Sequence, residues 1–182
     1  DGSLTLTDVD STDFDGGTLT VSLTANGSPE DRLALQNEGT SVGQVGQSGF
    51  DVTYNFGAGA VVIGTVSGGT SGSDPLVITF NANATAIAVE EVARQVAYMA
   101  LGDDPSGATR TVEFVVTDGD GGTSMAVSKD IAVTPVNDAP TITSGGAVSV
   151  GENQTAVSTV TASDVDGDTP TFSITGGADS GL

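Results

Sequence analysis

Apolar side chains alternate with threonine and serine along most of this 182-residue chain. In the clearest run, threonine or serine separates Leu19, Val21 and Leu23. Further alternating runs lie at residues 50–56, 112–116 and 172–174. Because successive side chains of a strand point to opposite faces, a period of two gives each strand one apolar face. The pattern therefore predicts a protein built from short β-strands, each with one buried face.

Glycine-rich segments at 68–69 and 121–122 separate these runs and are expected to be turns. Short strands at this spacing favour a β-sandwich. In the run at 50–56, the alternation places Phe50, Val52, Tyr54 and Phe56 on one face, and it assigns Tyr54 to the core.

One segment, residues 86–100, has helical spacing instead, with Val89, Val92 and Val96 on one side. Thr85 is the expected N-cap, and a glycine and a proline at 102 and 105 act as stop signals. The charged residues Glu90, Glu91 and Arg94 are expected to form a solvated face, with an ion pair between Glu90 and Arg94. The sequence therefore predicts one short helix at an end or edge of the sandwich.

Composition excludes several classes of function. The chain carries 24 acidic and only 4 basic residues, a formal net charge of −20, which argues against binding to nucleic acid or to an anionic membrane. It has no cysteine and no histidine, which excludes disulfides, thiol chemistry, Ser-His-Asp catalysis and ordinary zinc ligation. No apolar run is long enough to span a bilayer, so we expect no membrane insertion. No acid lies in an apolar, aromatic setting that would suit glycoside hydrolysis, so we expect no enzyme.

The tripeptide Asp-Val-Asp occurs twice, as Asp8-Val9-Asp10 and, 156 residues later, as Asp164-Val165-Asp166. Each copy follows a strand-like stretch and is followed by further aspartates, namely Asp13, Asp15 and Asp168. Carboxylates packed this closely repel one another, and a bound cation is a common reason for such a cluster. The alternative is that Asp, Gly, Ser and Thr simply form turns. Two copies in register favour the cation.

The segment TPVNDAPTIT, residues 134–143, reads as a stiff connector because Pro135 and Pro140 flank its Asn-Asp pair. It predicts a first domain at 1–137 and a second, at 138–182, made of the linker and the first part of another repeat. By the 156-residue offset, the first repeat lacks counterparts of residues 147–155. We expect the chain to be an excerpt of a longer protein, out of phase with its domains.

Four motifs, VNDAP (136–140), VGENQT (150–155), ASDVDGDTPTFSI (162–174) and VTDGDGGTS (116–124), together resemble the bacterial cadherin-like repeats of large surface adhesins of the repeats-in-toxin type. The helical segment and the residues after it also resemble the chondroitin-sulfate-proteoglycan repeat. The resemblance implies tandem Greek-key β-sandwiches with calcium ions at their junctions. Residues 25–75 carry none of these motifs.

The resemblance also implies calcium ligands. The predicted ligands are the linker pair Asn137 and Asp138, the Asp-x-Asp residues Asp8, Asp10, Asp164 and Asp166, the strand-end Asp118, and Glu152 and Asp168. Calcium prefers such oxygen ligands and needs neither histidine nor cysteine. The linker VNDAP offers fewer ligand residues than the family's DxNDNxP motif. In addition, Asp31-Arg32-Leu33 lacks the glutamate of an Asp-Arg-Glu motif. A three-ion junction is therefore not expected.

These features predict a calcium-stiffened spacer of a bacterial cell-surface adhesin or extracellular filament, whose partners are neighbouring repeats. Two alternatives remain. One is a module that binds a surface carbohydrate or protein, for which Phe14, Tyr54 and Tyr98 are the candidate aromatics. The other is assembly by donor-strand exchange, in which a neighbouring chain supplies the missing strands.

Overall fold

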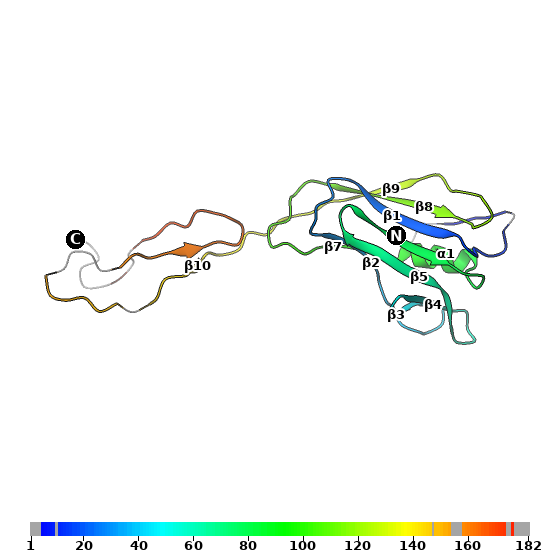
Figure 1. Cartoon of the computed structure of the whole chain (residues 1–182), viewed down its shortest axis with the longest axis horizontal. Helices are drawn as coiled ribbons and strands as arrows, with labels where there is room; N and C mark the ends of the chain where they lie inside the picture. Colours follow the sequence, from blue (N-terminus) through cyan, green and yellow to red (C-terminus); the bar gives the residue numbers. More distant parts are fainter. Residues whose placement is uncertain (1–4, 10, 147, 154–157, 174–175, 177–182) are drawn as a thin grey trace. The chain divides into compact units, whose positions relative to one another are not determined.

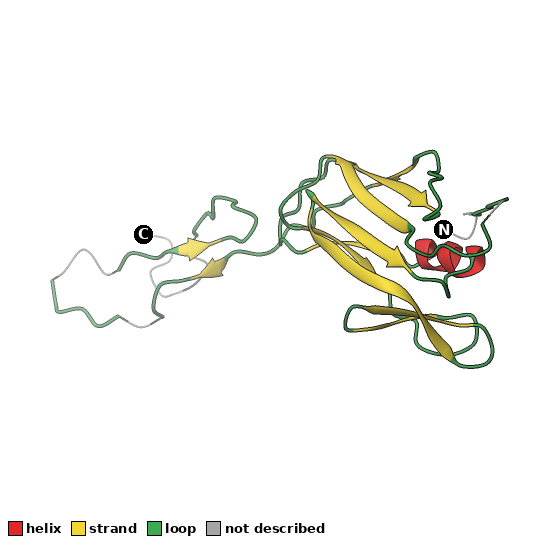
Figure 2. Cartoon of the chain, turned by 45° about the vertical axis from the view of Figure 1, so that its right-hand side comes forward, coloured by secondary structure: helices red, strands yellow, loops and turns green. Residues whose placement is uncertain are grey.

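The computed structural model describes residues 5–9, 11–146, 148–153, 158–173 and 176. The chain divides into two compact units, unit 1 (Asp1–Thr134) and unit 2 (Pro135–Leu182). Strands dominate the described residues, the long sheet is antiparallel throughout, and there is one short helix (Figures 1 and 2). The predicted all-β class is confirmed.

Unit 1 is built on a seven-stranded sheet. In spatial order its strands are β3 (Val45–Ser48), β4 (Asp51–Asn55), β5 (Ala60–Ser71), β6 (Asp74–Phe80), β1 (Thr18–Ala25), β8 (Arg110–Thr117) and β9 (Val127–Ile131). The predicted alternation holds in its central strands, where Leu19 and Val21 of β1 and Val112 of β8 are buried. This apolar face forms the core of the unit together with residues from outside the sheet.

A second, two-stranded sheet consists of β2 (Asp31–Leu35) and β7 (Val96–Ala100), with β2 packed against β5 and β6. The core-facing positions of β2 are Asp31, Leu33 and Leu35. Gly69 of β5 lies so close to this strand that a Cβ atom there would come within 2.1 Å of the Leu33 carbonyl oxygen. The backbones of the two sheets are therefore in direct contact at this point.

The helix α1 (Ala86–Arg94) is shorter than the pattern predicted. The hydroxyl of Thr85 caps it, as expected, and accepts from the amide of Ala88. However, the helix ends at Gln95, and the residues predicted to form its second half are β7, paired antiparallel with β2. Residues 96–100 are compatible with the period of a strand as well as with that of a helix. Their pairing with β2 makes them a strand. No helix in the described part of the chain is long and apolar enough to cross a bilayer.

Two further predictions were wrong in detail. Gly68 and Gly69 do not form a turn but lie inside β5, where both have positive φ angles and the register shifts. In the run at 50–56, Val52 and Tyr54 are buried as predicted, but Phe50 is 76% exposed and Phe56 is also exposed. Phe50 lies in the turn before β4 and Phe56 lies just after it, so the alternation of the strand does not reach them.

Unit 2 contains β10 (Thr141–Ile142) and β11 (Ala162–Ser163), which pair antiparallel. Most of its described residues are exposed. The predicted strand at 172–174 is not formed at Phe172, which is exposed, and its last residue lies outside the described residues.

Candidate functional site

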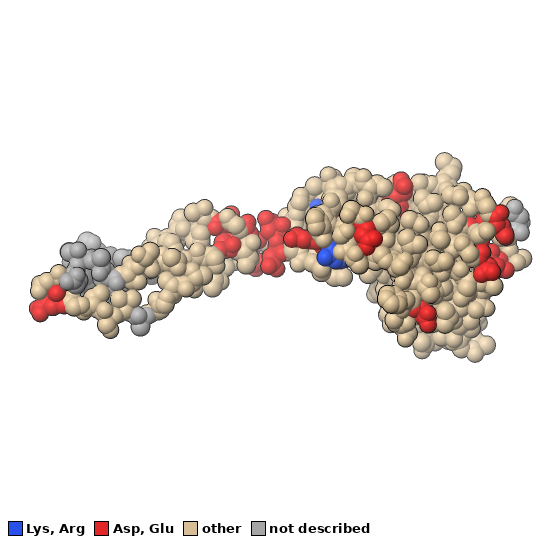
Figure 3. Space-filling model, viewed as in Figure 1, with Lys and Arg blue, Asp and Glu red and all other residues tan. Residues whose placement is uncertain are grey.

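The first group of predicted ligands lies at one end of unit 1, where acidic side chains gather on the surface (Figure 3). Asp8 and Asp118 line the same cavity, of about 260 Å³, together with hydroxyl residues that include Thr123 and Ser124. Nearby, Ser11 connects the two acidic segments, because its amide donates to Asp8 (3.0 Å) and its hydroxyl donates to Asp120 (3.2 Å). The structure thus brings together two acids that are 110 positions apart in the sequence.

Backbone packing holds these two acidic segments side by side. A Cβ atom on Gly119 would lie 2.0 Å from the Asp15 carbonyl oxygen, so only glycine fits there. The same turn is stabilised by Asp118, whose Oδ1 accepts from the amides of Asp120, Gly121 and Gly122 at 2.8–3.1 Å. One carboxylate oxygen of Asp118 therefore holds the turn in shape.

The second group lies within unit 2. The amide of Asp138 in the linker segment donates to Oδ2 of Asp166 at 2.6 Å. Asp164 Oδ1 accepts from the amide of Asp166 at 3.0 Å, and the side chain of Asn137 donates to the Asp138 carbonyl oxygen at 2.8 Å. The linker and the second Asp-Val-Asp are therefore in direct contact, although they are 28 positions apart in the sequence.

The remaining predicted ligands are placed less closely. Glu152 and Asp168 are exposed, and no hydrogen bond joins either to this group within the described part of unit 2. Asp10 lies outside the described residues. Among those that are described, no three acidic side chains converge closely enough to hold a metal ion. The donor set of carboxylate, hydroxyl and carbonyl oxygens suits calcium in its chemistry, but its side chains would have to draw together around the ion.

A third polar group lies inside unit 1, where the sequence pattern did not lead us to expect one. Asp31 of β2 forms a salt bridge with Arg110 of β8, with Nε and Oδ2 at 3.2 Å, and the two side chains are 0% and 1% exposed. The hydroxyl of Tyr98 donates to Asp31 Oδ1 at 2.6 Å, and the amide of Ser28 donates to Oδ2 at 2.7 Å. Arg110 also donates to the carbonyl oxygens of Ser106 and Ala108. The group joins the small sheet to the large one.

The electrostatics of this group follow from its hydrogen bonds. Burial alone would raise the pKa of Asp31, but the bonds from Tyr98, Ser28 and Arg110 outweigh it and lower the pKa. Burial, and then the bond to Asp31, raises the pKa of Tyr98 to about 12. The bond to Asp31 raises the pKa of Arg110. The carboxylate therefore stays charged and the phenol stays neutral at neutral pH.

The sequence did carry a signal for this group. Asp31 is in phase with Leu33 and Leu35, and Arg110 is in phase with Val112, so both charged residues occupy core-facing positions of their strands. A charged side chain at such a position is expected to have a partner of opposite charge. Comparing the phases of the two strands would have suggested the pair.

The charged face of α1 is less solvated than predicted. The Glu90–Arg94 ion pair is present, and Arg94 also contacts Glu91, but all three side chains are partly buried. Oε2 of Glu90 accepts from the amide of Leu6 at 2.9 Å. The helix therefore holds the segment that leads into the first Asp-Val-Asp.

The aromatic residues considered for carbohydrate binding are poorly placed for it. Phe14 and Tyr54 are buried in the core. Tyr98 is partly buried, and its hydroxyl is bound to Asp31. Phe50 was not among these candidates, although it is the most exposed aromatic of the described residues.

Comparison with known proteins gives no relative for this chain. No family model, curated protein or solved structure matches it.

Proposed function

We propose that this chain is a calcium-stiffened structural repeat of a bacterial cell-surface adhesin or extracellular filament. In this proposal the seven-stranded sheet and the β2–β7 pair are the two layers of a Greek-key sandwich of the cadherin-like kind. The observation that carries the proposal is the 2.6 Å hydrogen bond from the linker residue Asp138 to Asp166 of the second Asp-Val-Asp. It supports a role for these acids in fixing the linker to the repeat that follows.

The proposed mechanism is electrostatic. Without a cation, the acids around the linker repel one another and only hydrogen bonds hold the segment in place. Calcium would be shared by Asp138, Asp164 and Asp166, with Asn137 as a further oxygen donor, and would bring their carboxylates together. Asp8, Asp10 and Asp118 would form the equivalent site in unit 1. The effect would be a stiffer chain of repeats, whose stability includes the contact between neighbours.

Calcium titration tests this proposal. Sites in extracellular modules bind calcium with a Kd of about 10⁻⁴ to 10⁻³ M. At about 100 times Kd, one site stabilises the folded state by about 2.7 kcal/mol. We therefore expect Tm to be several degrees higher in 10 mM calcium chloride than in EDTA, and isothermal titration calorimetry to detect binding.

The matched variants are Asp166→Asn and Asp118→Asn, which keep the shape of each side chain and remove its charge. Each should weaken calcium binding, whereas Asp51→Asn, at an exposed position on β4, should leave it unchanged. Equal melting curves in calcium and EDTA would exclude the calcium proposal. The carbohydrate-binding alternative has less support, because the aromatics considered for it lie in the core or are bound to Asp31.

A further inference from the structure

The turn between β3 and β4 carries an aromatic side chain that the fold does not explain. Two residues, Gly49 and Phe50, join the paired ends Ser48 and Asp51 of the hairpin. Gly49 has a φ of 61°, which suits the first position of such a turn. Phe50 follows at a position where polar residues are usual, and it is 76% exposed. Neither turn chemistry nor burial in the core therefore accounts for an aromatic residue here.

Phe50 borders a cavity of about 250 Å³ in unit 1. The pairing of β4 with β5 ends at Asp51 and Thr65, where the amide of Val66 donates to the Phe50 carbonyl oxygen at 2.8 Å. Beyond this point β5 continues beside β6 without β4, and β2 packs against it. The cavity therefore lies between β2, the second half of β5 and the β3–β4 turn, whose hairpin extends away from the rest of the sheet (Figure 2).

The lining of this cavity is uncharged. Its apolar part includes Leu33, Leu35 and Leu76, and none of the described residues that line it is acidic or basic, although the chain has a net charge of −20. Asp74 adds a negative charge beside it, because its carboxylate accepts from the hydroxyl of the lining residue Thr70 at 2.6 Å. The cavity therefore favours a neutral ligand and disfavours an anionic one.

Neutral polar groups complete the lining. The side-chain amide of Gln47 donates to the Gly49 carbonyl oxygen at 3.0 Å, which leaves the amide oxygen of Gln47 as an acceptor. The hydroxyls of Ser67 and Thr70 both donate to acceptors within the protein and keep lone pairs that can accept. Gly68 is exposed and has no side chain, so it lines the cavity with backbone atoms. An exposed aromatic residue thus lies beside several polar groups that suit hydroxyl-bearing ligands.

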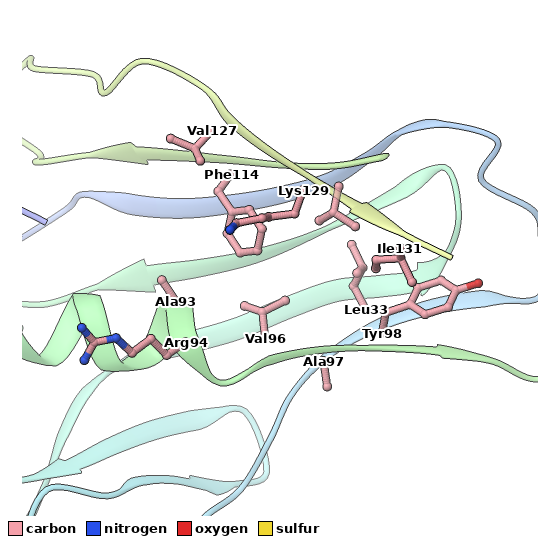
Figure 4. Close-up of a pocket in the computed structure, with 11 residues that line it drawn as sticks. Leu33, Ala93, Arg94, Val96, Ala97, Tyr98, Phe114, Val127, Lys129 and Ile131 are labelled. Carbon is pink, nitrogen blue, oxygen red and sulfur yellow. The ribbon is translucent and has the colours of Figure 1, made fainter. Parts of the chain in front are cut away.

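The cavity between β7 and β9 has a different chemistry (Figure 4). Its lining is mostly aliphatic and includes two cationic side chains, Arg94 and Lys129. The hydroxyl of Tyr98, which also lines it, donates to Asp31. The combination of an exposed aromatic residue with an uncharged polar lining is therefore found beside Phe50 and not in this cavity.

A sugar ring matches that combination. One face of a pyranose carries C–H groups, which pack against the negative π-face of an aromatic ring, and the hydroxyls around its edge need hydrogen-bond partners. The cavity is smaller than the pockets of about 300–1,000 Å³ that enclose drug-sized ligands, so it suits one sugar unit rather than a longer chain. We propose that it binds one unit of a neutral glycan, with the Phe50 ring against the C–H face of the sugar.

This binding site is separate from the proposed calcium sites. None of the predicted calcium ligands is among the described residues that line it. Glycan binding should therefore be equal in EDTA and in calcium. If it were absent, the calcium proposal would be unaffected, and a protein that does not bind calcium would still be expected to bind the glycan.

Saturation-transfer difference NMR on the full chain tests the proposal. The probes are neutral hexasaccharides of glucose, mannose, galactose and N-acetylglucosamine, with a heparin hexasaccharide as the anionic probe. At least one neutral probe should receive saturation at its ring C–H protons, with a Kd of about 1 mM because a single ring and a few polar groups make the contact. The heparin probe should not bind.

Variants at the turn assign the binding to Phe50. Phe50→Ala should weaken it at least tenfold, whereas Phe50→Trp, which keeps an aromatic face, should retain it. The matched control is Phe172→Ala, which removes an exposed phenylalanine of unit 2 and should leave binding unchanged. Far-UV circular dichroism checks that each variant is folded. Failure of all four neutral probes to bind, binding that Phe50→Ala leaves intact, or a preference for heparin would overturn the proposal.

Discussion

The buried pair Asp31 and Arg110 allows a sharp test of how the two sheets of unit 1 are held together. Asp31→Asn removes the charge and keeps the shape of the side chain. The Arg110 guanidinium, whose side chain is only 1% exposed, then stays buried without its counter-ion. Removing one partner of a buried ion pair costs about 3–5 kcal/mol.

The hydrogen bonds of Asp31 place the expected cost within that range. An asparagine can keep its oxygen toward the Ser28 amide and Arg110 Nε, which now contact Oδ2. Its NH₂ group then faces the Tyr98 hydroxyl, which can rotate to accept, and Nη2 of Arg110, which cannot. Because one contact is lost and the others are kept, we expect Asp31→Asn to lower the free energy of unfolding by about 3 kcal/mol, the low end of this range.

Urea unfolding at pH 7, followed by tyrosine fluorescence, measures this cost. Both tyrosines of the chain lie in unit 1 and there is no tryptophan, so the signal reports on that unit alone. With a slope of about 2 kcal/mol per molar urea, the midpoint should fall by about 1.5 M. The control Asp51→Asn, at an exposed position, should change stability by about 0.5 kcal/mol or less.

A double-mutant cycle with Arg110→Met separates the pair from its surroundings. If the two charges stabilise unit 1 through each other, the double variant should be more stable than the sum of the single effects predicts, by at least about 1.5 kcal/mol. A midpoint shift below about 0.5 M for Asp31→Asn, or fully additive effects, would refute this account of the pair.

Three further substitutions test other parts of unit 1 by the same unfolding measurement. Tyr98→Phe removes a hydrogen bond to the charged Asp31 and should cost about 1.5–3 kcal/mol at pH 7. Because burial raises the pKa of Tyr98 to about 12 from about 10 in the unfolded chain, the wild type should lose stability between pH 10 and 12, and this loss should be smaller in the variant. Gly69→Ala should cost at least about 2 kcal/mol, because its φ is positive and its Cβ would clash with the Leu33 carbonyl; a neutral result would show that the sheets can separate there. Thr85→Ala should cost about 0.5–1 kcal/mol, and no loss would mean that the cap is not needed.

The all-β class could be predicted because alternation is a local property of the sequence. It succeeded where a strand lies in the middle of a sheet, as at Leu19 and Val21, and failed at strand ends, as at Phe50. The length of α1 could not be predicted, because residues 96–100 fit both periods and only their pairing with β2 makes them a strand. Tertiary pairing overrides local preference in such ambiguous segments.

Among the candidate sites, too, those with a local sequence pattern were predicted and the one that depends on tertiary contacts was not. Repetition marked the two Asp-Val-Asp segments, and the resemblance marked Asp118 and Asp138. In the structure Asp8 and Asp118 line one cavity, and Asp138 is hydrogen-bonded to Asp166. The Asp31–Arg110 pair was missed because the core-facing phase of each residue shows only that it needs a partner, not which residue that partner is. The two residues are 79 positions apart, so only a comparison of the two strands could have paired them.

The positions of the four basic residues bear on the charge balance of all these sites. Arg110 is bound to Asp31 in the core, Arg94 to the acids of α1, and Arg32 to the carbonyl oxygens of Pro29 and Asp31. Lys129 lies on β9, and no basic residue lines the cavity that Asp8 and Asp118 share. Since no basic side chain lines that cavity, we expect the charge of its acids to be balanced mainly by cations from solution. That distribution is the physical reason to expect a dependence on calcium at the acidic turns, and it predicts that chelation acts there and leaves the buried Asp31–Arg110 pair intact.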